Sequence, residues 1–226
     1  FSGMNGQPED YNIKTRFMDN RHRPGGNITG VYEKLHIREA LKVLSGMLDL
    51  KTVLILEDRS PTGKAISLQA KMELDGHHTE PVPCSIRRKN LGSWEEFQET
   101  IHQINSDPDI DAYYLGTLLL RDDRGHTHTA REIVEYAVTH AGKPAMGMNY
   151  AFIKMGLFGG ATIDFYAMGY QAGKKAAAVL GGADPGTLPI EDADRVALVF
   201  NLARAETLGL KIPEDILLAA DEVFRK

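Results

Sequence analysis

Polar side chains follow three short apolar segments of the sequence, at the points where strands are expected to end. These side chains are Asp58, Ser60, Thr117, Asn149 and Tyr150. Hydroxyl groups can bind a carboxylate, an acidic side chain can bind an ammonium group, and an aromatic ring can cover an apolar side chain. These residue types therefore suit a site for a zwitterionic small molecule such as an amino acid. Asp164, which precedes a predicted helix, is a second candidate for the ammonium group.

Each candidate also has a purely structural interpretation. Ser60 precedes a proline and can serve as the N-cap of a helix, and Asp164 can cap the helix that follows it. Asp58 can lie in a solvated loop, and Tyr150 can pack within its own loop. Capping and ligand binding are compatible, because the free N–H groups at a helix start attract anions. Both interpretations therefore stay open.

Other chemistry has little support in the sequence. His126 and His128 are two residues apart with acidic residues nearby, and His77-His78 forms a second pair. Neither pair belongs to an HExxH motif or has a cysteine partner, so no metal site is predicted. The glycines near residue 159 match no nucleotide-binding loop, and no catalytic triad signature is recognisable. We therefore predict no cofactor and no enzymatic activity.

The composition restricts the class of protein. The chain has 226 residues, of which 42% are hydrophobic and 25% charged, with a formal net charge of -5. This composition is globular, and without a basic excess it gives no indication of a nucleic-acid partner. No apolar run approaches the roughly 20 residues of a membrane-spanning helix. The single cysteine, Cys84, excludes an intrachain disulfide and is compatible with the cytoplasm or the periplasm.

Hydrophobic periodicity predicts alternating helices and strands. Apolar residues at 37, 41, 44 and 48 recur with helical spacing, whereas 52–57 is a short β-branched run typical of a buried strand. The same criteria predict a helix over 61–74, a strand over 81–86, a helix over 93–105, a strand over 111–117, a helix from 129 and a strand over 144–148. Capping boxes, one of them Thr129 with Glu132, support two of these helices. Such alternation predicts an α/β fold with a parallel sheet and helices on both faces.

The last third of the chain predicts a long helix over 165–180, a strand over 195–201 and helices over 202–208 and 214–224. The first four residues, followed by turn-forming residues, have the pattern of a strand end.

Several segments together resemble one bacterial family. The run 23–31, RPGGNITGV, is similar to a family segment R-P-G-G-N-V-T-G-V, and 164–169, DFYAMG, is similar to its D-Y-x-x-x-G stretch. The runs 199–202, VFNL, and 208–213, LGLKIP, resemble its C-terminal part in order and spacing. The chain is thus similar to ABC transporter substrate-binding proteins of the tryptophan/tyrosine type.

This resemblance implies the type I periplasmic-binding-protein fold, in which two α/β lobes close on a small molecule. On this basis residues 1–29 form the end of lobe 1 and a crossover, and 30–160 form lobe 2. Residues 161–192 return to lobe 1, and 193–226 form a crossover strand and the C-terminal helices. Lobe 2 is expected to be complete, whereas lobe 1 is expected to be partial, with its N-terminal part missing. Ser2 and Asn5, at the end of a lobe 1 strand, join the expected ligand-binding residues.

One loop departs from the family pattern. Family members place an aspartate soon after the threonine that corresponds to Thr117, whereas this sequence has Leu118-Leu119-Leu120 and then the polar insert 121–126. The ligand contacts of that loop are therefore not transferable from the resemblance.

The resemblance favours a periplasmic or extracytoplasmic solute-binding protein. Its partners would be a small-molecule ligand, with an aromatic amino acid as the candidate, and the membrane permease of an ABC importer. The alternative is the ligand-sensing extracytoplasmic domain of a membrane-bound receptor with a fused signalling domain. A sugar-responsive repressor core and an enzyme on a flavodoxin-like sheet are weaker alternatives.

Overall fold

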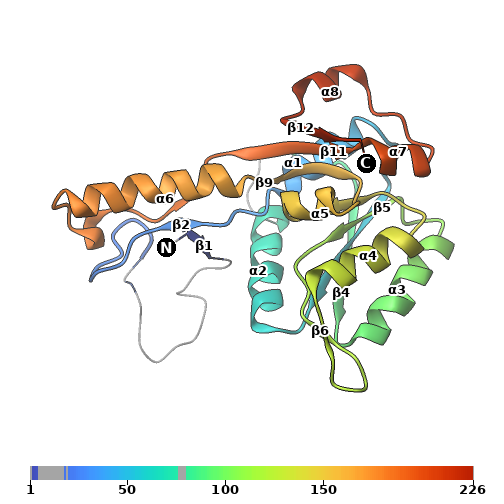
Figure 1. The fold of residues 1–226 in the computed structure, drawn as a ribbon, viewed down its shortest axis with the longest axis horizontal. Helices are drawn as coiled ribbons and strands as arrows, with labels where there is room; N and C mark the ends of the chain where they lie inside the picture. The colour runs from blue at the N-terminus through green and yellow to red at the C-terminus, as the bar shows by residue number, and fades with distance from the viewer. Residues whose placement is uncertain (1, 5–17, 19, 76–79, 226) are drawn as a thin grey trace. The chain divides into compact units, whose positions relative to one another are not determined.

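The computed structural model describes residues 2–4, 18, 20–75 and 80–225 (Figure 1). The chain divides into two compact units. The smaller unit comprises residues 1–35 and 163–196, and the larger comprises 36–162 and 197–226. Within the described residues, no helix has both the length and the apolar character needed to cross a membrane.

The larger unit is built on a parallel sheet with the strand order β4-β3-β5-β8. The strands are β3 (Thr52–Asp58), β4 (Ser85–Leu91), β5 (Ala112–Leu115) and β8 (Ala145–Gly147). All three neighbouring pairs are parallel. β3 is buried along its whole length, which explains its continuous apolar sequence.

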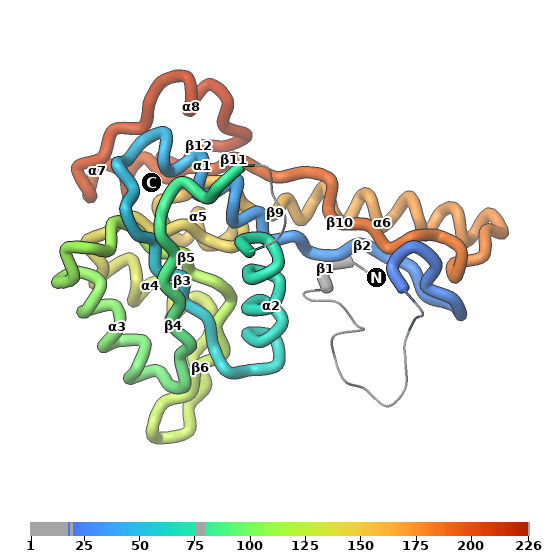
Figure 2. The backbone as a smooth tube through the Cα atoms, turned by 180° about the vertical axis from the view of Figure 1, so that it is seen from behind, coloured from blue at the N-terminus to red at the C-terminus, as the bar shows by residue number. Residues whose placement is uncertain are grey.

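Helices cover both faces of this sheet. They are α1 (Ile37–Ser45), α2 (Pro61–Asp75), α3 (Trp94–Ser106), α4 (Ala130–His140) and α5 (Tyr150–Lys154). Figures 1 and 2 show α3 and α4 on one face and α2 on the other. The main apolar core joins Phe97 and Ile101 of α3 and Val134 of α4 to Tyr113 and Leu115 of β5.

Two smaller sheets complete the larger unit. β6 (Leu120–Arg121) and β7 (Thr127–His128) form an antiparallel hairpin. A three-stranded sheet has the order β12-β11-β9, with β9 (Gly159–Ile163), β11 (Val196–Asn201) and β12 (Glu222–Phe224). The short helices α7 (Leu202–Thr207) and α8 (Glu214–Ala219) lie between β11 and β12 in the sequence.

The smaller unit contains the parallel sheet β1-β2-β10 and one long helix. Its strands are β1 (Ser2–Met4), β2 (Val31–Tyr32) and β10 (Glu191–Asp192). The long helix α6 (Phe165–Leu180) contacts β1 and β2, and a 3-10 helix, η2 (Pro185–Thr187), follows it. Met18, Tyr32 and Ile190 form its small apolar core.

The structure confirms the α/β class with a parallel sheet, and it shifts two predicted elements. The strand predicted over 81–86 begins at Ser85, because Pro81 and Pro83 lack the N–H that a ladder needs. The helix predicted over 214–224 ends at Ala219. Asp221 then bonds Leu198 twice, through its backbone N–H and through its carboxylate, each at 2.8 Å, and this pairing starts β12.

The two units are defined by packing within the chain. The predicted lobes are defined differently, as the parts that close on a ligand. The predicted lobe boundaries after residues 29, 160 and 192 therefore stay predictions.

Candidate functional site

Five of the predicted site residues lie at one edge of the larger unit's sheet. Asp58 ends β3 and Ser60 follows it, Thr117 follows β5, and Asn149 and Tyr150 follow β8. β3, β5 and β8 are consecutive in the sheet and parallel, so their carboxyl ends share an edge. In open parallel sheets this edge is where ligands bind.

Asp58 is fully engaged by the protein. Its side chain is 1% exposed. Oδ1 accepts hydrogen bonds from the Ser60 N–H at 2.9 Å and the Ser60 hydroxyl at 2.6 Å, and Oδ2 accepts one from the Leu119 N–H. The carboxylate thus joins the loop after β3 to the loop after β5. It acts as a positioning group for both loops, and the predicted contact of Asp58 with a ligand ammonium group stays a prediction.

Ser60 is the N-cap of α2, as the sequence predicts. Its Oγ accepts a hydrogen bond from the Gly63 N–H at 3.0 Å. Gly63 permits the close approach of Asp58, because a Cβ at residue 63 would lie 1.9 Å from Asp58 Oδ1. The hydroxyl of Ser60 therefore already serves both Asp58 and Gly63.

Thr117 differs from these two residues. It is half-buried, and no hydrogen bond joins its hydroxyl to any residue that the structure describes. Asp58 fixes the backbone of this loop two residues further on, at Leu119. Thr117 thus offers a hydroxyl without a protein partner on a fixed loop at the strand-end edge.

Asn149 and Tyr150 form the third part of the edge. Asn149 is the N-cap of α5, its Oδ1 accepting from the Phe152 N–H at 3.2 Å, and its amide nitrogen donates to no described residue. The Tyr150 hydroxyl donates to the carboxylate of Glu222, and this bond raises the pKa of Tyr150 to about 12. Its ring packs edge-on against Phe224 at 5.5 Å between centroids. Tyr150 is thus held by β12.

The remaining predicted residues belong to the smaller unit. Asp164 caps α6 through the Ala167 N–H at 2.9 Å, and its Oδ2 lies 3.3 Å from Nε of Arg195. Both carboxylate oxygens therefore have partners within this unit. Ser2 lies on β1 in register with Val31. Asn5 lies outside the residues that the structure describes.

The structure also reveals an ion pair of a buried glutamate with a partly exposed arginine, which the sequence does not indicate. Glu57, beside Asp58 on β3, is 3% exposed and contacts Arg88 of the neighbouring strand β4, with Nε to Oε1 at 3.1 Å. The Ser67 hydroxyl donates to its other oxygen at 3.1 Å. In the sequence, Glu57 simply ends an apolar run. Its cationic partner is recognised only when β3 and β4 are seen to lie side by side.

A pocket in the larger unit lies away from these residues. Its lining includes Leu48, Pro108, Asp111, Pro144 and Leu210. Asp111 and Pro144 precede β5 and β8, so this pocket is at the amino-terminal edge of the sheet. The predicted residues and the pocket thus mark opposite edges.

Comparison with known protein families identifies the family of this chain. Residues 12–224 match the family model described as ABC transporter substrate binding protein. The chain belongs to this family. Its members are solute-binding proteins that act outside the cytoplasm, not enzymes. A search of curated protein sequences gave no match.

Solved structures of this family share the fold. The chain is similar to an ABC domain from Streptococcus pneumonia in complex with L-Trp, with a TM-score of 0.72 and 22% identity over 97% of this chain and 71% of that one. A conserved domain protein from Vibrio cholerae has a TM-score of 0.69 and 22% identity over 91% and 66% of the two chains. A ligand-free, open substrate-binding protein with adhesive properties from Clostridium difficile has a TM-score of 0.69 and 16% identity over 99% and 70%. The predicted periplasmic-binding-protein fold is therefore confirmed.

Proposed function

We propose that this protein is the extracytoplasmic solute-binding component of an ABC importer, with an amino acid as its ligand. The family match over residues 12–224 carries the proposal. The relative from Streptococcus pneumonia, which was solved with L-Trp, makes an aromatic amino acid the first candidate. The protein would perform no chemistry and would transfer its ligand to a membrane permease.

The strand-end edge of the larger unit supports a site for a carboxylate. The hydroxyl of Thr117 and the amide nitrogen of Asn149 have no partner among the described residues, so each can donate to an anionic oxygen. Asp58 would act indirectly by fixing the loop of Thr117. For Ser60, Tyr150, Asp164, Ser2 and Asn5, a ligand contact in the closed state stays a prediction.

The proposed mechanism is closure of two lobes on the ligand. A ligand that contacts both lobes has a higher affinity for the closed state than for the open state, and it therefore shifts the population to the closed state. Such binding also stabilises the folded protein, by about 2.7 kcal/mol when the ligand is present at 100 times its dissociation constant.

The melting temperature of the full-length gene product tests this proposal. We expect one amino acid of a complete panel, or a small group of related ones, to raise the melting temperature in a concentration-dependent manner. The absence of a shift with every amino acid and related metabolite would contradict the proposal.

A sensory role is the second candidate, and the divergent hairpin β6–β7 leaves it open. This hairpin contains the polar insert 121–126 that departs from the family pattern, directly after the loop of Thr117. A changed loop beside the site is compatible with signalling to a fused domain. A gene that continues past Lys226 into a membrane helix and a kinase or cyclase domain would decide for the sensor, whereas a neighbouring permease gene would decide for the importer.

A further inference from the structure

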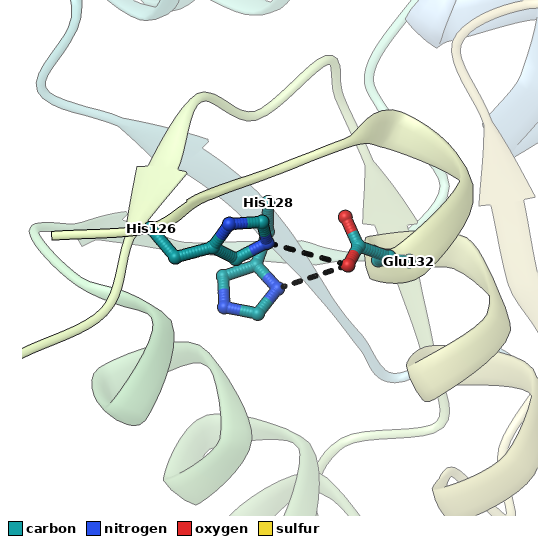
Figure 3. A group of neighbouring side chains, drawn as sticks. All are labelled: His126, His128 and Glu132. Carbon is teal, nitrogen blue, oxygen red and sulfur yellow. Dashed lines mark hydrogen bonds and ion pairs between the residues drawn. The ribbon is translucent and has the colours of Figure 1, made fainter. Parts of the chain in front are cut away.

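Three side chains with metal-binding groups meet beside the hairpin β6–β7. His126 immediately precedes β7, His128 ends it, and Glu132 lies in the first turn of α4. Figure 3 shows both imidazole rings facing one carboxylate oxygen of Glu132. One ligand atom from each residue can be chosen so that all three lie within 4.8 Å of one another.

The distances are close to those of a coordinated ion. Nε2 of His126 lies 3.4 Å and Nδ1 of His128 lies 3.9 Å from Oε1 of Glu132. Ligand atoms of a tetrahedral zinc ion, with bonds of about 2.0–2.1 Å, lie about 3.3 Å apart. The three atoms, at most 4.8 Å apart, must therefore move closer together to share one ion, and the side chain of His126, which is 56% exposed, has room to move.

The carboxylate of Glu132 is held in place by the capping box of α4. Its Oε2 accepts from the Thr129 N–H at 2.6 Å and from the Thr129 hydroxyl at 2.8 Å. These bonds leave Oε1 directed to the histidines.

His128 has the surroundings of a second ligand. Its side chain is 13% exposed, its ring stacks on Trp94 at 3.9 Å between centroids, and neither ring nitrogen has a hydrogen-bond partner in the described structure. Nε2 lies 3.8 Å from Oδ2 of Asp122. If Nδ1 binds an ion, Nε2–H faces Asp122, and a slightly closer approach would give the hydrogen bond that orients ligating histidines in metal sites.

We propose that His126, His128 and Glu132 form a binding site for a first-row transition dication, for which Zn²⁺ is the best fit. Two imidazoles and one carboxylate suit zinc, whereas magnesium and calcium prefer oxygen ligands alone. The three protein ligands leave a fourth position for water or an external ligand. The bound ion would link the loop between β5 and α4 to the start of α4.

This inference departs from the expectation drawn from the sequence. His-x-His followed four residues later by Glu matches no established motif, and no cysteine lies near His126 and His128 in the sequence. The hairpin turns His126 back toward α4, and the capping box orients Glu132 in the same direction. The competing interpretation is a set of surface ion pairs between protonated histidines and Glu132, which requires no metal and contributes little stability.

Trp94 supplies an internal reporter for the test. It is the only tryptophan of the chain and it stacks directly on His128. A bound Co²⁺ ion at this distance should quench its fluorescence. We expect titration of the chelator-treated protein with Co²⁺ to give saturable quenching at one equivalent. Zn²⁺ should reverse the quenching by displacement, and Mg²⁺ should not.

Single-residue variants distinguish this site from non-specific binding of Co²⁺ to other histidines. His126→Ala and His128→Ala should each weaken the Co²⁺ affinity at least about tenfold, the lower end of the effects seen even for residues outside the coordination sphere. Glu132→Gln should weaken it too, while a glutamine preserves the capping box. The control His102→Ala removes a histidine of another pair, with His140, whose rings lie 6.1 Å apart. This variant should leave the affinity unchanged.

Three results would overturn the proposal: quenching that does not saturate, an unchanged affinity in His126→Ala, or a loss confined to His102→Ala. Circular dichroism checks that the variants are folded. If His128→Ala loses structure, His126→Ala decides, because the side chain of His126 is 56% exposed and contributes little to packing. The proposal does not depend on the identity of the ligand at the strand-end edge.

Discussion

The backbone N–H of Leu119 donates to the carboxylate of Asp58, which precedes it by 61 residues. This bond connects the end of β3 to the loop that follows β5. The same carboxylate binds the Ser60 backbone and hydroxyl. The position of Thr117 at the strand-end edge therefore depends on a carboxylate that already accepts three hydrogen bonds from the protein.

Replacing Asp58 should destabilise the protein strongly. Asp58→Ala leaves the Leu119 N–H and the two donors of Ser60 without their acceptor at partly buried positions. We expect the free energy of unfolding to fall by about 1.5–3 kcal/mol, the range for hydrogen bonds to a charged group. Denaturant unfolding followed by circular dichroism measures this change. Asp49→Ala, a change at an exposed aspartate, serves as control and should stay within about 0.5 kcal/mol of wild type.

Replacing two helical glycines by alanine should change the free energy of unfolding in opposite directions. In Gly63→Ala the new Cβ would lie 1.9 Å from Asp58 Oδ1 and 2.4 Å from its carbonyl oxygen, so backbone must shift. We expect a loss of about 2 kcal/mol. In Gly173→Ala the Cβ meets nothing within 4 Å on α6, and the better helix propensity should stabilise by about 0.5–1 kcal/mol. Equal effects in the two variants would contradict the close approach of Asp58.

Thr117→Val tests the predicted ligand contact of the larger unit. The substitution keeps the shape of the side chain and removes its hydroxyl. A hydrogen bond to a charged group contributes about 1.5–3 kcal/mol, so the affinity for the ligand should fall at least about tenfold. Calorimetric titration with the ligand found by the melting screen measures it. Thr139→Val, which removes a hydroxyl bonded to the Glu135 carbonyl of its own helix at 2.7 Å, should not change the affinity. An unchanged affinity in Thr117→Val would show that the Thr117 hydroxyl does not bind the ligand.

The reactivity of Cys84 should require alkaline pH. Burial, with a smaller contribution from the carboxylate of Asp111, raises the pKa of the Cys84 thiol to about 11. Both causes disfavour the thiolate, which is the reactive form. The rate of labelling by iodoacetamide should therefore still rise above pH 9 in the folded protein. In the denatured chain it should level off above the ordinary pKa of about 8.5. Equal pH profiles for the two states would contradict the shielding of Cys84.

Local sequence patterns predicted the parallel framework well, because its information lies in short segments. The buried run from Thr52 defines β3, and Thr129 with Glu132 makes the complete capping box that marks the start of α4. The caps at Ser60 and Asp164 are confirmed for the same reason. Each of these features depends on residues at most a few positions apart.

Contacts between residues far apart in the sequence determine the features that local patterns did not predict. Whether Asp58 faces solvent or the protein depends on the N–H of Leu119, and the direction of Tyr150 depends on Glu222. The strand over 222–224 forms because β11 offers an edge to it, although its own sequence continues a helical pattern. Such partners are distant in the sequence and leave no periodic signal.

Binding of a small molecule is the central claim, and a native mass spectrum of the full-length protein tests it most directly. The spectrum is recorded as purified and again after equilibration with a mixture of amino acids. We predict one added mass per chain, matching a single amino acid, in the second spectrum. The bare protein mass in both spectra, with the protein shown to be folded, would contradict the account.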